Sequence, residues 1–255
     1  AAPGDGIWSG TLPGQSANVT AAFYVQARDS SNTLTQYPAD YTNHECYVMF
    51  GQAAQSGNFG NMRIWTSDAG ISTWYDRARV DNAPINATVV YNDTRVVYGG
   101  GVHYKSSPYT RMKVWEGAAG HPETANQSYT VILPERDEIM GGDKFVLDYL
   151  DNTGGTFQME QFEYWMASKL GITVSPERYF HVYINQYHKG VIYGDLFAPS
   201  GDYTDMWFPG QKGDLYECGR WEFYNDDYSG NVEWGGSWDE THRFQDGTFR
   251  SVWCE

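Results

Sequence analysis

The sequence predicts an α+β fold that is predominantly antiparallel β, with one or two helices packed on a sheet. Two compositional observations support this. Aromatic residues make up 16% of the 255 residues, and the chain contains 28 glycines. Large aromatic faces pack well on pleated sheets, and glycine makes the turns between strands. The third observation is that only one stretch has a helical spacing of apolar residues, whereas strand-like segments recur along the whole chain.

The first strand-like segment is Val19–Ala27, in which Val19, Ala21, Phe23 and Val25 alternate with polar residues. Asn92-Asp93-Thr94 lies between two later segments and predicts a tight hairpin turn. The other expected strands are Cys46–Phe50, Met62–Thr66, Ala87–Tyr91, Arg95–Tyr98, Gly101–Tyr104, Tyr129–Leu133, Phe145–Leu150, Arg178–Asn185 and Val191–Phe197.

One helix is expected between Thr156 and Leu170, because Met159, Phe162, Met166 and Leu170 recur at three- and four-residue steps. These four residues form one apolar face. Thr156 suits the N-cap, and Gly171 stands where a left-handed C-terminal residue is wanted. We expect the following hairpin to turn through the five residues 186–190.

The chain is acidic, with a formal net charge of −15 at pH 7. Such a surface repels phosphate backbones and anionic lipids, so we expect no nucleic-acid partner. No run of 18 apolar residues occurs, so we also expect no membrane insertion. The start Ala1-Ala2-Pro3-Gly4 would suit a chain trimmed by signal peptidase or an arbitrary boundary, and we expect a secreted, extracellular protein.

Three cysteines leave at least one outside any intramolecular pair. We predict a disulfide between Cys218 and Cys254, which are close in sequence, and expect Cys46 to be buried or available for an intermolecular bond. Four Asn-x-Ser/Thr sequons are candidate glycosylation sites, although one or two would occur by chance. They lie at Asn18, Asn86, Asn92 and Asn126.

Four motifs from Ala87 to Asp227 together resemble the CotH kinase family (spore-coat protein H-like) in its secreted bacterial form. They are RVVYGGGVHYKSSPY from Arg95, MEQFEYWMASKLGI from Met159, RYFHVYINQYHKGVIYGDLFAPSGDY from Arg178, and WFPGQKGDLYE with WEFYND from Trp207. The resemblance implies that residues 86–255 form the β-rich lobe of an atypical protein kinase, truncated before its helical catalytic part. Residues 1–85 are then an N-terminal β-rich region.

A kinase of this family would use ATP and Mg²⁺ to phosphorylate Ser or Thr, so cations must face the phosphates and carboxylates must hold the metal. The candidate catalytic residues are Asp195, Lys105 and Arg111. The sequence departs from the family at Gly194-Asp195, which supplies one carboxylate where two are expected, and at Glu217, which replaces a lysine. An anion in place of a cation disfavours ATP.

The candidate metal ligands, for Ca²⁺ or Mg²⁺, are Asp195, Asp202, Asp226 and Asp227. Hairpin-end aspartates also cap turns, which is the alternative for all four. On the helix, Glu160 and Glu163 have two alternatives, a cation in a cleft or solvent. His181 and His188 flank the hairpin without a Cys or carboxylate at ligand spacing, so no zinc site is expected.

Three functions remain open. The first is a cell-surface structural or assembly module, a pseudokinase that associates with itself, a surface protein or a polysaccharide. The second is a secreted CotH-type Ser/Thr kinase, or a fragment of one. The third is a carbohydrate-binding module that uses exposed Trp and Tyr rings.

Overall fold

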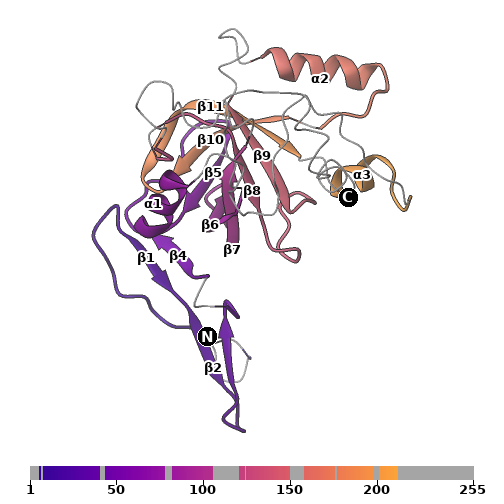
Figure 1. Cartoon of the computed structure of the whole chain (residues 1–255). Coiled ribbons are helices and arrows are strands. Elements are labelled where there is room, and N and C mark those ends of the chain that lie inside the picture. Colours follow the sequence, from indigo (N-terminus) through magenta and orange to yellow (C-terminus); the bar gives the residue numbers. More distant parts are fainter. Residues whose placement is uncertain are drawn as a thin grey trace, which may run out of the picture.

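The protein is a closed β-barrel that carries a long β arm (Figure 1). The computed structural model describes Gly6 and residues 8–40, 44–77, 82–105, 121–123, 125–149, 158–175, 177–197 and 201–211. The chain is therefore β-rich and mostly antiparallel, as expected. The structure goes beyond the expected sheet with helices, because the main sheet curves until its first and last strands pair.

The barrel has the strand order β10-β11-β9-β8-β7-β6-β5. Its strands are β5 (Gly60–Trp65), β6 (Ile85–Tyr91), β7 (Arg95–Tyr104), β8 (Tyr129–Ile132), β9 (Lys144–Tyr149), β10 (Arg178–Ile184) and β11 (Tyr187–Phe197). Neighbouring strands are antiparallel except β5 and β10, which pair in parallel and close the barrel. At this junction Gly60 lies opposite Phe180, and a Cβ at Gly60 would meet the Phe180 ring at 2.4 Å. The aromatic ring therefore takes the space that a side chain at residue 60 would need.

The barrel interior is aromatic. Trp74, from helix α1 (Asp68–Asp76), contacts Tyr104 and Tyr129, and Tyr129 stacks on Tyr193 with a centroid distance of 6.1 Å. All four side chains are almost completely buried. Alternation along the strands places one face of each inside, so the aromatic composition identified in the sequence supplies this core.

One cation lies within this apolar surrounding. Lys189 of β11 is 5% exposed, its Nζ donates to the carbonyl of Pro122 over 2.7 Å, and it lies 5.7 Å from the Tyr129 ring centroid. Burial lowers the pKa of Lys189 to about 7, against a smaller opposing effect of Glu123. The register of β10 and β11 shifts between His181 and Tyr183, which is the irregularity that accompanies the inward lysine.

Helix α2 (Met159–Lys169) forms as predicted, but its orientation differs from the expectation. Gly171 has φ +75°, and the amide of Ile172 donates to Ala167, which is the Schellman C-terminus that the glycine predicted. The predicted core face, by contrast, is at the surface. Met159, Phe162, Met166 and Leu170 are 49%, 57%, 45% and 74% exposed. Tyr164 on the opposite side packs on Val146 of β9 instead.

Several local predictions differ from the structure in detail. The two segments expected within 95–104 form the single strand β7, which bends at a bulge where Gly99 has φ +70°. The second hairpin turns through Asn185-Gln186, since Ile184 pairs with Tyr187, and not through residues 186–190. The turn at residues 92–94 is confirmed, with positive φ at Asn92 and Asp93.

The N-terminal arm consists of two separate ribbons. Strand β1 (Thr20–Phe23) pairs with β4 (Cys46–Met49) beside the barrel, and β2 (Val25–Arg28) pairs with β3 (Leu34–Tyr37) farther out (Figure 1). The single strand expected over Val19–Ala27 thus breaks at Tyr24.

Cys46 is 1% exposed and free, as one of the two expectations had it. The predicted boundary between residues 85 and 86 falls inside β6, directly after its first residue Ile85, and β6 is a strand of the barrel.

Among the described residues, no helix has both the length and the apolar character needed to cross a membrane.

Candidate functional site

The side of α2 that faces the barrel is strongly acidic. Glu160 projects toward Asp148 of β9 and toward Lys105, which follows β7; both act electrostatically on its carboxyl group. Burial and the charge of Asp148 raise the pKa of Glu160, while Lys105 opposes them. Oε2 of Glu160 is buried and has no hydrogen-bond partner among the described residues. This cluster therefore brings the predicted Lys105 to the predicted helix, but with carboxylates in excess.

Tyr164 extends the same cluster along α2. Burial is the main cause that raises the pKa of Tyr164 to about 12, and Glu160, Glu177, Asp148 and Glu163 add to it. Four carboxylates thus influence one phenol. A hydroxyl in this position is a neutral group that can donate or accept hydrogen bonds over the whole physiological pH range.

Asp148 is fixed by the barrel. Its Oδ1 accepts a hydrogen bond from Ser128 Oγ over 2.5 Å, and the same Oγ accepts from the amide of Tyr149. The carbonyl of Ser128 accepts the amide of Lys105 over 2.9 Å. Adjacent strands β7, β8 and β9 therefore hold the lysine and the carboxylate side by side.

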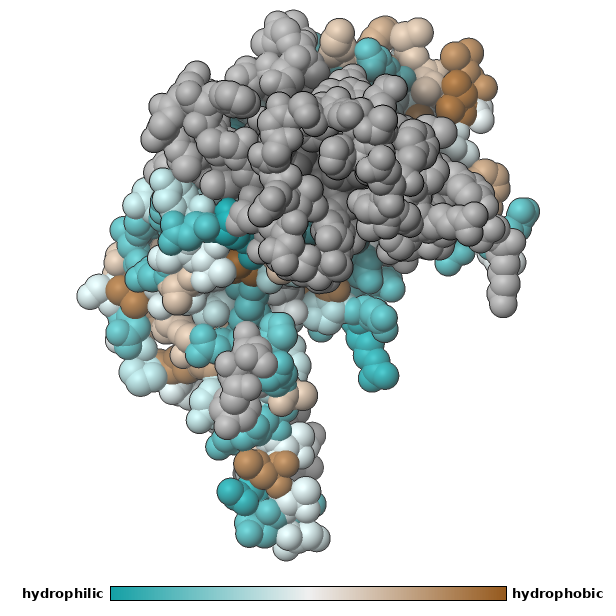
Figure 2. Space-filling model, viewed as in Figure 1, coloured by the Kyte–Doolittle hydropathy of each residue, from teal (hydrophilic) through white to brown (hydrophobic). Residues whose placement is uncertain are grey.

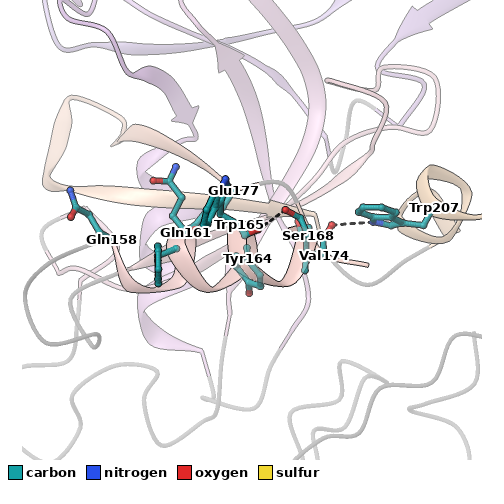
Figure 3. Close-up of a pocket in the computed structure, with 10 residues that line it drawn as sticks. Gln158, Gln161, Tyr164, Trp165, Ser168, Val174, Glu177 and Trp207 are labelled. Carbon is teal, nitrogen blue, oxygen red and sulfur yellow. Dashed lines mark hydrogen bonds between the residues drawn. The ribbon is translucent and has the colours of Figure 1, made fainter. Parts of the chain in front are cut away.

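Helix α2 lines one wall of a groove of about 620 Å³ (Figure 3). The other wall comes from Val174, Ser175 and Glu177, and from Trp207 of helix α3 (Gly201–Trp207). The lining residues of α2 and its start are Gln158, Gln161, Phe162, Tyr164, Trp165 and Ser168. The groove is thus rich in aromatic rings and carries amides, hydroxyls and a carboxylate between them.

The rings are held in place. Phe162 and Trp165 stack with a centroid distance of 5.9 Å and an interplanar angle of 24°. The indole N–H of Trp207 donates to the carbonyl of Val174 over 3.0 Å, so α3 is tied to the opposite wall. Trp165 and Trp207 are 55% and 37% exposed. Apolar side chains gather at the end of α2 in Figure 2, where an apolar helix face meets solvent. Such a face marks a binding surface.

The remaining predicted site residues are placed less completely. Asp195 lies in β11, where its backbone pairs with Arg178 and Leu147, and Asp202 lies in α3. Arg111, Asp226 and Asp227 lie outside the described residues, as do Cys218 and Cys254 of the predicted disulfide. No group of three or more metal-ligating residues occurs within the part of the chain that the structure describes.

The four sequons differ in their surroundings. Asn18 and Asn92 are exposed at positions with φ of 66° and 50°. Asn86 is half-buried, and its Nδ2 donates to the carbonyl of Glu45 and to the hydroxyl of Tyr47. Asn126 is half-buried as well. A glycan attaches to Nδ2, so Asn18 and Asn92 offer the more accessible acceptors, and glycosylation at any of the four stays a prediction.

Sequence reasoning missed Asp148, Ser128 and the Trp207–Val174 contact. The spacing of residues held no signal for them, because these contacts join residues of different elements that meet only in the folded chain. No protein-family model matches the chain, and no curated protein matches it. The resemblance to the CotH kinase family therefore rests on the four motifs alone.

Proposed function

We propose that the chain is an extracellular binding module that uses the groove between α2 and α3 to hold a cell-surface polysaccharide. It would do so on a CotH-like lobe without complete kinase machinery. The observation that supports this is the composition of the groove, in which stacked and tethered aromatic rings alternate with amide and carboxylate side chains.

Sugars need both kinds of group. The C–H face of a pyranose ring carries partial positive charge and stacks on the negative face of an aromatic ring. Its hydroxyls are recognised by side chains that accept and donate in fixed directions, such as the Gln161 amide and the Glu177 carboxylate. A groove open along its length accommodates a chain of sugar units, and its few polar groups set the orientation.

The acidic cluster argues against phosphoryl transfer by this part of the chain. Lys105 is accompanied by Glu160 of α2 and by Asp148 and Glu163, whose charges act on the Glu160 carboxyl group. A triphosphate needs an excess of cations around it. Three carboxylates to one lysine give a negative local field, which repels ATP.

A glycan array with the full chain tests the proposal. Trp165→Ala and Trp207→Ala should each weaken the binding of a polysaccharide about two- to tenfold, since stacking on one ring is worth about 0.5–1.5 kcal/mol. Trp8→Ala is the matched control, because Trp8 is 96% exposed and lies outside the groove. Equal binding by all three variants, or no glycan bound at all, would contradict the proposal.

The second candidate is a CotH-type ATP-dependent protein kinase. One observation favours it: Lys105 lies near Glu160 of a helix, the residue pair that positions ATP in protein kinases. Calorimetric titration with Mg·ATP separates the two functions. We expect no binding below millimolar concentrations. Micromolar binding that is lost in Lys105→Met or Asp195→Ala would establish the nucleotide site instead.

A further inference from the structure

Two histidines lie side by side on the outer face of the barrel. His181 belongs to β10 and His188 to β11, and Nδ1 of His181 is 3.1 Å from Nε2 of His188. Val182 and Ile184, which alternate with His181 and Tyr183 along β10, are fully buried, so the two rings stand on the solvent side. Both strands are part of a closed sheet, which makes their backbone a rigid support.

The pairing of this hairpin places the two rings together. His181 pairs with Ile192 before the register shift, and Tyr183 pairs with His188 after it, so the two histidines are diagonal neighbours across the ladder. The same shift accompanies Lys189, which points inward.

Aromatic neighbours hold both rings. Tyr183 stacks on His188 at a centroid distance of 4.7 Å, and Phe59 contacts His181 at 5.9 Å. The Arg63 guanidinium in turn lies 4.3 Å from the Tyr183 ring centroid, and its charge is balanced by Asp93. The pair is therefore pre-arranged rather than assembled by a ligand.

We propose that His181 and His188 form a two-histidine site for a divalent transition-metal ion of the zinc, nickel and copper class. Two imidazole nitrogens at about 2.0–2.1 Å from one ion are about 3.3 Å apart at a tetrahedral angle and about 2.9 Å apart at a right angle. The separation of 3.1 Å lies between these two values. The ion replaces the hydrogen between the nitrogens, and that proton moves to the other nitrogen of its own ring.

The ligand set defines the class of ion. Imidazole nitrogen suits zinc, copper and nickel, whereas calcium and magnesium prefer oxygen. No third His, Cys, Asp or Glu joins the pair among the described residues, so water completes the coordination. The ion keeps open positions and exchanges readily, as a two-ligand surface site does. The net charge of −15 attracts cations to the surface.

Calorimetric titration of the full chain with Ni²⁺, and separately with Zn²⁺, tests this site. We expect saturable one-to-one binding that weakens at least about tenfold in His181→Gln and in His188→Gln. His44→Gln is the matched control, because His44 is an exposed histidine paired with Asp40 in the arm. Bound ion should also raise the Tm of the wild-type protein and leave both variants of the pair unchanged.

A second measurement needs no variant. In the wild-type protein, the Hε1 resonances of His181 and His188 should shift or broaden together on addition of Ni²⁺, ahead of the other four histidines. Binding that is equal in all variants, or resonances of the pair that stay unchanged at saturating ion, would overturn the proposal.

Discussion

The barrel and the outer ribbon of the arm are built from similar strand sequences but are stabilised in different ways. In the barrel every strand has two neighbours and one buried face. In the ribbon, β2 and β3 have only each other, and all four residues of β2 are exposed. Figure 2 shows an apolar patch near the tip of this arm, in contact with solvent.

The difference shows what an alternating pattern can and cannot predict. Alternation in Val19–Ala27 correctly predicts extended backbone, since β1 and β2 both form there. It does not predict burial. Val25 is 54% exposed because no second layer covers the ribbon, whereas Val102 at a similar position in β7 is fully buried. Burial depends on which distant segment of the chain packs on the strand, and the local pattern does not identify that segment.

The largest expected contrast comes from one substitution made in both regions. Leu147→Ala in β9 removes a fully buried side chain and should lower the free energy of unfolding by about 2–5 kcal/mol, because a cavity remains. Leu34→Ala in β3 removes a side chain that is 39% exposed and should change the free energy by about 0.5 kcal/mol or less. Urea unfolding measures both. Equal shifts of the urea midpoint in the two variants would mean that Leu34 is buried by another part of the protein or by a second copy.

The buried lysine should make barrel stability depend on pH. The pKa of Lys189 is about 7 in the folded state because of burial, below the ordinary value of 10.5 that the unfolded chain retains. Between these values the unfolded state binds the extra proton, so stability rises with pH, by up to about 1.4 kcal/mol per unit. From pH 7 to 9 the wild-type protein should therefore gain about 2–3 kcal/mol.

Lys189→Met should remove this dependence, and Lys169→Met on the exposed surface of α2 should keep it. Urea unfolding at several pH values measures the slope. The comparison stops at pH 9, since Cys46 and the buried tyrosines add their own titrations above it. A slope that is the same in Lys189→Met and in the wild-type protein would show that the amine is not buried.

Two ion pairs, one in the barrel and one in the arm, differ in burial in the same way, and we expect a smaller difference in stability from them. Arg63 is almost fully buried and its Nε is 2.5 Å from Asp93 Oδ1, whereas His44 and Asp40 in the arm are 3.5 Å apart and about half exposed. Burial alone would raise the pKa of Asp93, but hydrogen bonds from Arg63 and from the amide of Gln55 hold it below its usual value. The contribution of this pair is therefore present at neutral pH and lost as the pH falls through the folded-state pKa.

Asp93→Asn should cost about 1–3 kcal/mol, since it leaves a buried guanidinium without its counter-charge. Asp40→Asn should cost less than about 0.5 kcal/mol, as exposed pairs do. Thermal unfolding at pH 7 measures both. If Asp93→Asn and Asp40→Asn lowered the free energy of unfolding equally, we would conclude that water reaches the Arg63 guanidinium.

The smallest effect concerns association. Each strand of the outer ribbon has an open edge that can pair with another copy. Val25→Lys should reduce concentration-dependent light scattering, measured with and without Ca²⁺ at fixed ionic strength, while leaving the free energy of unfolding within about 0.5 kcal/mol. Val96→Lys on the exposed barrel surface is the control. A wild-type protein that stays monomeric at high concentration would remove the support for self-assembly.

Turns and helix ends were the parts of the fold that the sequence could predict, because they depend on local residues. The turn at Asn92-Asp93-Thr94 and the helix end at Gly171 depend on residues within a few positions, and both are confirmed. Helix α1 was missed because only Ile71 and Trp74 face the core in nine residues, too few for a visible period. The outward face of α2 could not be foreseen, since apolar periodicity identifies a helix but not the surface it meets.

The candidate sites depend even more on distant contacts. Lys105 and the helix of Glu160 were singled out by their motifs, and the fold brings them to one place. Trp207 and Val174 meet across a stretch of chain that no spacing rule covers. No zinc site was expected at His181 and His188, because no Cys or carboxylate stands at ligand spacing to them, and the pairing of β10 with β11 makes the two histidines neighbours.

The parallel junction of β5 and β10 also sets the order in which the chain can fold. As the chain leaves a ribosome or a secretion channel, β5 to β9 appear first and can form only an open sheet. Its exposed edge must wait for β10, because contacts between distant segments close last. Until β10 pairs with it, the unpaired backbone N–H and C=O groups of β5 can bind a strand of another chain. A factor that shields this edge during synthesis would act on the incomplete barrel and have no target on the finished one.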